Sequence, residues 1–168
     1  GYMAKKEDEK TNVMRVLDQK KIAYKHYCYI KPGDEVTTNG VEIARLLGEN
    51  VEKVFKTLVT VAKSGQHYVF MVPVARELDL KKAAKAVGEK SIEMIPQKEL
   101  LPLTGYIHGG CSPIGMKKTF PTTIDASAKE FETIIFSAGK VGYQVEVAPR
   151  NLEKVVRISY EDICIETE

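Results

Sequence analysis

The sequence predicts an α/β fold in which helices lie outside a mixed, mostly antiparallel sheet. Three observations support this class: predicted strands outnumber predicted helices, several strands are joined by tight turns, and the helices begin and end at capping residues. Hydrophobic residues make up 43% of the 168 residues, enough for a sizeable core. We expect a flexible, charged N-terminal segment at residues 1–10 and a single domain at residues 11–168.

A hairpin is the clearest local prediction. Residues 55–63 form an apolar strand, Ser64 and Gly65 a tight turn, and residues 67–74 the returning strand. Further strands are predicted at residues 23–30, 92–95, 122–125, 133–137 and 143–147. Helices are predicted from Thr11 to about residue 20, from Thr38 or Asn39 to Gly48, and at residues 79–87, 97–101 and 152–156, with a turn at 31–34.

The charge is nearly balanced, with 25 basic and 23 acidic residues and a net charge of +2. Proteins that hold nucleic acid by phosphate contacts alone are strongly basic. If the substrate is a nucleic acid, this protein must therefore contact only a small part of it or gain affinity from a partner protein. The three cysteines form neither a disulfide framework nor a Cys-x-x-Cys pair. No apolar run approaches the roughly 20 residues of a membrane span. We expect a cytoplasmic protein without membrane contact.

Lys56 is the first candidate functional residue because it interrupts an apolar strand. Side chains alternate between the two faces of a strand, so Lys56 shares its face with Leu58. Phe55 and Val59 occupy the opposite face, which is also apolar. This pattern predicts that the lysine lies beside a pocket. The alternative is a lysine near a strand end whose ammonium simply reaches water.

The loop at residues 109–115 (GGCSPIG) is the second candidate. Its glycines leave backbone N–H groups unshielded and permit positive φ, so the loop can bring amides close to an anion or a carbonyl oxygen. It has neither the Gly-Lys-Ser/Thr ending of a Walker loop nor the spacing of a dinucleotide-binding fingerprint. A plain connection between strands is the alternative.

Three further residues are candidates for the same cleft. Tyr29 ends a predicted strand and could stack on a base, although a half-buried strand tyrosine is the alternative. Ser137 ends another strand, where a simple turn is the alternative. Cys111 lies in the glycine loop, and we expect it to line the pocket rather than act as a nucleophile. The three histidines lack zinc-ligand spacing, so no metal is expected.

Several segments, taken in order, resemble one known family. They are residues 54–58 (VFKTL), 72–74, 78–88, 109–115, 137–139, 145–147 and 151–152. The resemblance runs from about Asn12 to Ile163, and the ordered set is more specific than any one segment. It is similar to the YbaK/EbsC group of aminoacyl-tRNA deacylases, which is related to the editing domain inserted in bacterial prolyl-tRNA synthetases.

This resemblance implies a mixed sheet partly curled into a barrel with surrounding helices. It implies a hydrolase or lyase that edits Cys-tRNA(Pro) in trans, with Cys-tRNA(Cys) as a further substrate, and that serves translation fidelity in protein biosynthesis. The implied partners are the acceptor end of a mischarged tRNA and prolyl-tRNA synthetase, and no cofactor is implied. The alternatives are a deacylase of another mischarged tRNA such as Ala-tRNA(Pro), and a non-catalytic module that binds tRNA or a synthetase.

The resemblance also assigns roles to residues. Lys56 and Gly109 match the family's catalytic lysine and loop glycine. The implied substrate contacts are Tyr29, Gly110, Ser112, Pro113, Ser137 and Gln144. Gln144 is a departure, because many Cys-specific members have an aspartate at this position, and an amide can neither act as a base nor carry negative charge. This difference predicts a slower reaction or a shifted amino-acid preference.

The mechanism implied by the resemblance uses the substrate instead of a protein nucleophile. The thiol of a cysteinyl ester attacks the ester carbonyl and releases a cyclic thioester, so Ser-tRNA should react far less. Backbone amides near Gly109 would hold the carbonyl oxygen and exclude larger side chains. The Lys56 ammonium would hold the terminal phosphate or ribose. Because the ester is activated, positioning can suffice.

Overall fold

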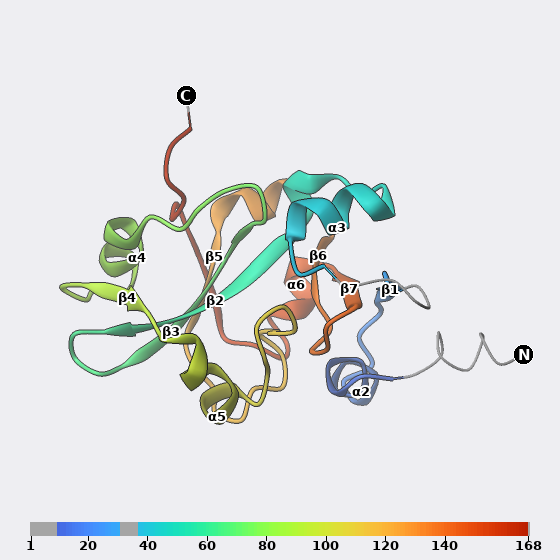
Figure 1. The fold of residues 1–168 in the computed structure, drawn as a ribbon, viewed down its shortest axis with the longest axis horizontal. Coiled ribbons are helices and arrows are strands. Elements are labelled where there is room, and N and C mark those ends of the chain that lie inside the picture. Colours follow the sequence, from blue (N-terminus) through green and yellow to red (C-terminus); the bar gives the residue numbers. More distant parts are fainter. Residues whose placement is uncertain (1–9, 31–36, 168) are drawn as a thin grey trace, which may run out of the picture.

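The computed structural model describes residues 10–30 and 37–167, which form two sheets with helices around them (Figure 1). The three-stranded sheet has the order β1-β7-β6, and the five-stranded sheet has the order β4-β2-β3-β5-β8. The strands are β1 (Lys25–Cys28), β2 (Phe55–Ala62), β3 (His67–Pro73), β4 (Ile92–Met94), β5 (Thr122–Asp125), β6 (Ile134–Ser137), β7 (Tyr143–Val147) and β8 (Ile158–Glu161). In the described residues, β5 pairs in parallel with β3 and β8, and the other pairs are antiparallel. The predicted fold class is therefore confirmed.

The helices begin and end largely where the capping residues predict. They are α2 (Asn12–Gln19), α3 (Gly40–Leu47), α4 (Leu80–Val87), α5 (Leu100–Thr104) and α6 (Pro149–Leu152), with 3-10 turns η1 (Val51–Lys53), η2 (Gln97–Glu99) and η3 (Ala126–Glu130). The side chain of Thr11 accepts a bond from the Met14 N–H at the start of α2, and that of Asn39 does so from Glu42 at the start of α3. Gly48 ends α3 at a φ of +67°, a left-handed conformation that costs glycine little.

The two sheets meet where β2 begins. Val54, immediately before β2, forms a parallel bridge with Ile135 of β6. Figure 1 shows β1 and β7 on one side of the molecule and α4 with β4 on the other, with β2 running between them. In the described residues the sheets remain separate instead of closing into one barrel, so the expected curl is partial. No helix in this part of the chain is long and apolar enough to span a bilayer.

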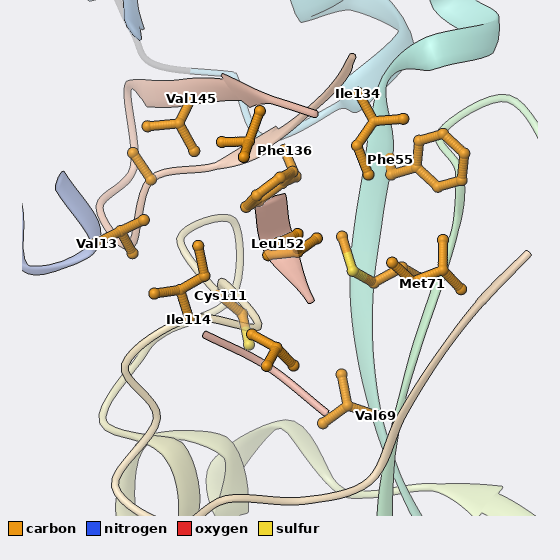
Figure 2. Close-up of a cluster of buried hydrophobic side chains, with 14 of the residues drawn as sticks. Val13, Phe55, Val69, Met71, Cys111, Ile114, Ile134, Phe136, Val145 and Leu152 are labelled. Atoms are coloured by element: carbon orange, nitrogen blue, oxygen red, sulfur yellow. The ribbon is translucent and has the colours of Figure 1, made fainter. Parts of the chain in front are cut away.

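Both faces of β2 contribute buried side chains, in keeping with the apolar residues that the sequence places on each face. Phe55 and Val59 belong to the larger core, in which side chains from both sheets, α2, α6 and the glycine loop point toward one another (Figure 2). Ala62 belongs to a second core that packs against α4. Because side chains pack against both faces of this strand, the backbone position of Lys56 within it is fixed.

Two C-terminal elements differ from the sequence-based expectation. The helix predicted at residues 152–156 is wrong: α6 ends at Leu152, since Pro149 favours the first helical turn and the chain then turns to reach β8. Strand β8 was not predicted, because its alternation of half-buried and exposed residues covers only four positions and its partner β5 is distant in the sequence. The predicted turn at residues 31–34 and residues 1–9 of the predicted N-terminal segment lie outside the described residues.

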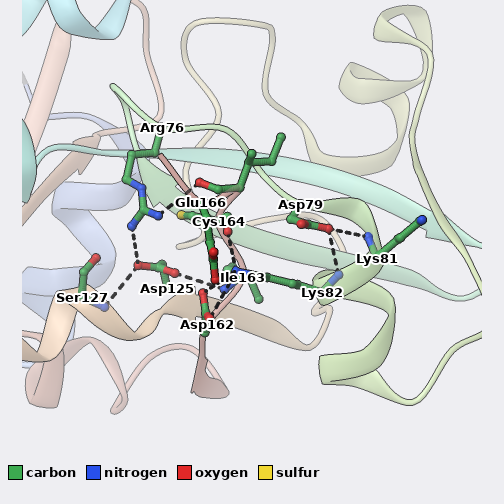
Figure 3. Close-up of polar contacts among 11 residues, drawn as sticks. Arg76, Asp79, Lys81, Lys82, Asp125, Ser127, Asp162, Ile163, Cys164 and Glu166 are labelled. Carbon is green, nitrogen blue, oxygen red and sulfur yellow. Dashed lines mark hydrogen bonds and ion pairs between the residues drawn. The ribbon is translucent and has the colours of Figure 1, made fainter. Parts of the chain in front are cut away.

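The segment after β8 is held by polar contacts (Figure 3). The buried carboxylate of Asp125 accepts hydrogen bonds from the Ile163 N–H at 3.1 Å and the Ser127 N–H at 3.2 Å. Arg76 donates to the Ile165 carbonyl at 3.2 Å, and Lys82 donates to the Cys164 carbonyl at 2.9 Å. These bonds hold the C-terminal segment against the end of β5, the turn after β3 and helix α4.

A buried carboxylate reinforces that junction. Glu146 of β7 accepts hydrogen bonds from Lys53 at 2.8 Å and from the hydroxyls of Thr133 and Tyr27. Burial raises the pKa of Glu146, but the three donors outweigh burial and lower this pKa to about 2. Lys53 lies on η1, so this network ties the three-stranded sheet to the start of β2.

We predict that Glu146→Gln removes a pH-dependent part of the stability. The pKa falls from 4.5 to about 2 on folding, so the ionised carboxylate stabilises the fold above pH 4.5, and this contribution is lost as the pH falls through about 2. The free energy of unfolding should differ between wild type and variant by about 3 kcal/mol at pH 6 and by much less near pH 2. Urea unfolding across this range measures the difference. Glu130→Gln, at an exposed position, is the control, and a difference independent of pH would contradict the prediction.

Candidate functional site

A small cavity of about 190 Å³ lies at the sheet junction. It is lined from three directions: by the start of β2, by the end of β6 and the start of β7, and by α3 with the glycine loop. The lining residues are Tyr29, Thr38, Gly40, Ile43, Phe55, Lys56, Thr57, Leu58, Leu100, His108, Gly109, Cys111, Phe136, Ser137, Tyr143 and Gln144. Of the residues assigned from the sequence, Lys56, Gly109, Tyr29, Ser137 and Gln144 are brought together here.

Lys56 enters this pocket from a rigid strand. It pairs with Val72 of β3 in the antiparallel register, and 28% of its side chain is exposed. Its ammonium lies 3.3 Å from a carboxylate oxygen of Glu77, whose side chain is 74% exposed. An ion pair this open to water contributes little. The ammonium can therefore exchange Glu77 for an anionic or polar group of a ligand at small cost.

Gly109 occupies a position that only glycine fits without strain. Its φ is +85°, and a Cβ there would lie 2.6 Å from the Thr38 Cγ2 atom, well inside normal contact. The neighbouring Gly110 N–H already donates to the Ile107 carbonyl at 2.9 Å. The bare backbone of Gly109 thus forms one wall of the pocket, and its N–H has no recorded partner among the described residues.

Three residues assigned to substrate contact lie behind the pocket wall. Ser112 is fully buried, and its hydroxyl accepts a hydrogen bond from the Ile114 N–H at 3.4 Å. Pro113 is buried and borders a different cavity beside α2. Gly110 packs against the backbone of Val141. In this structure these residues shape the loop, and their direct contact with substrate stays a prediction.

Cys111 lines the pocket, and Figure 2 shows its side chain among the core residues. Burial raises the pKa of the Cys111 thiol to about 12. The thiol is protonated at neutral pH and is a poor nucleophile. Burial likewise raises the pKa of Tyr29, whose hydroxyl stays protonated and able to donate. No group of three or more His, Cys, Asp and Glu side chains gathers as a metal site in the described residues.

Sequence reasoning missed Glu49, which lies behind Gln144. The Gln144 side chain is buried, and its amide nitrogen donates to the two carboxylate oxygens of Glu49 at 2.8 and 3.3 Å. The opposite amide orientation would set an oxygen against a carboxylate, so this one is assigned. Burial raises the pKa of Glu49 to about 7. No local pattern marks Glu49, because the contact joins residues that are far apart in the sequence.

We predict that Gly109→Ala destabilises the protein by more than Gly88→Ala. Both glycines have positive φ, at +85° and +74°, but a Cβ at Gly88 meets nothing within 4 Å. The backbone strain of about 1–2 kcal/mol should be common to both variants, and overpacking against Thr38 should add about 1–3 kcal/mol at Gly109 only. Urea unfolding measures both costs. Thr38→Ser removes the clashing methyl and should restore part of the loss, whereas equal costs for the two alanine variants would contradict this account.

Comparisons with known proteins identify the family of this chain. The sequence profile of the aminoacyl-tRNA editing domain matches residues 34–155. The chain is 45% identical over 159 residues to EbsC of Enterococcus faecalis, named for deacylation of Cys-tRNA(Pro) and Cys-tRNA(Cys), covering 95% of this chain and 96% of that protein. It is 29% identical to proline–tRNA ligase of Shouchella clausii over 123 residues, which is 73% of this chain and 21% of the ligase.

A solved structure shares the fold. It is described as a trans-editing enzyme for prolyl-tRNA synthetase, and it superposes with a TM-score of 0.76 at 22% identity, covering 94% of this chain and all of that chain. The profile match spans more than half of the sequence, and the match to EbsC covers nearly all of both chains. The chain therefore belongs to the aminoacyl-tRNA editing domain family.

Proposed function

We propose that this protein removes mischarged cysteine from tRNA(Pro), acting in trans, and that it also accepts Cys-tRNA(Cys). Membership of the editing family makes it an aminoacyl-tRNA deacylase. The observation that supports the proposal is the junction pocket, whose lining includes both Lys56 and Gly109. We further propose that residues 11–168 act as one deacylase domain in the cytoplasm.

Lys56 and Gly109 bind different groups at the end of the tRNA. Lys56 holds the terminal phosphate or ribose in place of Glu77 and offsets charge that develops on the leaving oxygen. The Gly109 N–H donates to the ester carbonyl oxygen, which becomes more negative as the carbonyl is attacked. The space that a Cβ would need at Gly109 is already filled by Thr38, and this crowding supports a limit on the size of the amino acid.

The attacking group is the thiol of the substrate. Its sulfur forms a bond with the ester carbonyl carbon while the bond from that carbon to the ribose oxygen breaks. The thiol proton passes to the ribose oxygen, which leaves as a hydroxyl, and water then opens the cyclic thioester to give cysteine. The high pKa of the Cys111 thiol supports this assignment, since the cysteine that lines the pocket is not activated.

Prolyl-tRNA synthetase is the proposed partner. The net charge of +2 provides little general attraction for a tRNA backbone, so selection of the tRNA needs a second protein. The likeness to a segment of a proline–tRNA ligase supports this choice.

One observation favours a second candidate substrate, Ala-tRNA(Pro). The pocket carries the neutral amide of Gln144 at the position where the family resemblance leads us to expect an aspartate in cysteine-specific members. Assays of Cys-, Ala- and Ser-tRNA(Pro), with and without the synthetase, separate the candidates. Rapid loss of cysteine alone supports the first proposal, and rapid loss of alanine supports the second. Binding of tRNA without release of any amino acid would contradict both and indicate a non-catalytic module.

We predict that Lys56→Ala lowers deacylation of Cys-tRNA(Pro) by at least about 100-fold, because charge stabilisation at the leaving group is lost. The fold should survive, since the variant loses only an exposed ion pair with Glu77. Single-turnover deacylation and thermal unfolding measure the two effects. Lys63→Ala, at an exposed position just after β2, is the matched control. Undiminished deacylation by Lys56→Ala would remove Lys56 from the mechanism.

We predict that Cys111→Ala keeps deacylation of Cys-tRNA(Pro) within a few-fold of wild type. The Cys111 thiol stays protonated, and its loss leaves only a small gap in the core, at a cost of about 1 kcal/mol in stability. The same single-turnover assay measures the rate. If Cys111→Ala stays folded and loses as much deacylation activity as Lys56→Ala, Cys111 is the nucleophile. That result would contradict the substrate-assisted mechanism.

A further inference from the structure

The contact between Glu49 and Gln144 joins the pocket to a carboxylate outside its lining. Gln144 lies on β7, opposite Ser137 of β6 in the register, and is itself part of the lining. Glu49 follows the Gly48 that ends α3, and its own N–H donates to the Ala44 carbonyl at 2.8 Å. Both backbones are therefore fixed, one by the sheet and the other by the helix end. The hydrogen bond between the two side chains spans the seam between these elements.

The carboxylate decides which end of the amide faces it. An ionised carboxylate only accepts hydrogen bonds, so it must be met by the amide nitrogen of Gln144. The nitrogen and oxygen of a carboxamide point in different directions. With the nitrogen held by Glu49, the oxygen is the end that remains for the pocket. A protonated Glu49 can itself donate, and it would permit the amide to turn and present its nitrogen to the pocket.

The other charged and titratable groups around Glu49 are already engaged. In the described residues these are Tyr27 on β1, Lys53 on η1 and Glu146 on β7. Lys53 donates to Glu146 and to Thr133, each at 2.8 Å, and Tyr27 donates to Glu146. Glu146 adds negative charge near Glu49, and Lys53 offsets it. The direct hydrogen bond that is recorded for the Glu49 carboxylate therefore comes from Gln144.

We propose that Glu49 is a positioning residue, whose ionised carboxylate orients the Gln144 amide so that its oxygen accepts a hydrogen bond from the α-amino group of the substrate, which carries N–H donors in both of its protonation states. This inference rests on the proposed function of the same pocket. Every aminoacyl ester carries an α-amino group beside the carbonyl carbon, so a fixed acceptor at Gln144 would orient that carbon toward Gly109. Glu49 acts through Gln144 and does not touch the substrate.

The proposal makes deacylation depend on the protonation of Glu49. Burial raises the pKa of Glu49 to about 7, so the carboxylate is ionised above this pH and protonated below it. The ratio of kcat/KM between wild type and Glu49→Gln should rise through about pH 7 to roughly tenfold at pH 8. The substrate's own amine titrates equally in both assays, and the uncatalysed loss of the ester is subtracted. The ratio therefore isolates Glu49.

A structural defect would give a different result. The raised pKa means that the ionised carboxylate destabilises the folded state as the pH rises through about 7, because the unfolded chain ionises near 4.5. Glu49→Gln should accordingly unfold at the same or a higher urea concentration than wild type at pH 8, even as its kcat/KM falls. Glu52→Gln, an exposed carboxylate on η1, is the matched control and should change neither quantity.

The experiment combines these pH profiles, measured between pH 5.5 and 8.5 with Cys-tRNA(Pro), with NMR titration of the Gln144 side-chain amide. The amide signal should shift with a midpoint near pH 7 in wild type but not in Glu49→Gln. If the wild-type Gln144 amide signal does not shift with pH, or if the kcat/KM ratio stays constant across the range, the positioning role of Glu49 is overturned. Either result leaves the proposed function intact. Wild-type protein that is inactive at every pH would overturn the proposed function, and the positioning role with it.

Discussion

The structure depends on the contact that seats the start of β2 against the three-stranded sheet. The contact includes the backbone bridge between Val54 and Ile135 and the hydrogen bonds from Lys53 to Glu146 and Thr133. They fall immediately before Lys56. Without these interactions, Lys56 on the five-stranded sheet would not be held beside the three-stranded sheet. The pocket at the junction would then lose the wall that β2 provides.

The chemistry of the pocket follows from the packing around it. Packing on both faces of β2 leaves Lys56 few positions, and Thr38 fills the space beside Gly109. Burial keeps the Cys111 thiol protonated. The site is therefore suited to positioning an ester that is already reactive, and it contains no activated thiol in the described residues. Positioning of this kind can supply much of a rate enhancement.

The sequence predicted local structure well, because local signals determine it. Thr11, Asn39 and Gly48 cap helices where expected, and the hairpin of β2 and β3 has the predicted turn. The pairing of β8 with β5 joins residues 36 positions apart in the sequence, such as Thr122 and Ile158, and no local pattern records it. The helix predicted at residues 152–156 failed because the pattern of apolar residues there outweighed the signal of Pro149.

The same distinction applies to the site. Lys56 and Gly109 could be selected from the sequence, because a charge in an apolar strand and a cluster of glycines are visible locally. Glu49 could not, since its importance comes from a hydrogen bond to Gln144 across 95 positions of sequence. The burial of Ser112 and Pro113 could not be predicted either, because a motif shows which residues form a loop but not which of them face the cavity.

A crystal structure with a non-hydrolysable cysteinyl-adenosine amide that carries a 5′-phosphate is the most direct test of the central claim. The account predicts that the cysteinyl carbonyl lies within hydrogen-bonding distance of the Gly109 N–H and that the Lys56 ammonium leaves Glu77 for the ribose or phosphate. An analogue bound outside the sheet junction, with Lys56 still paired to Glu77, would contradict it.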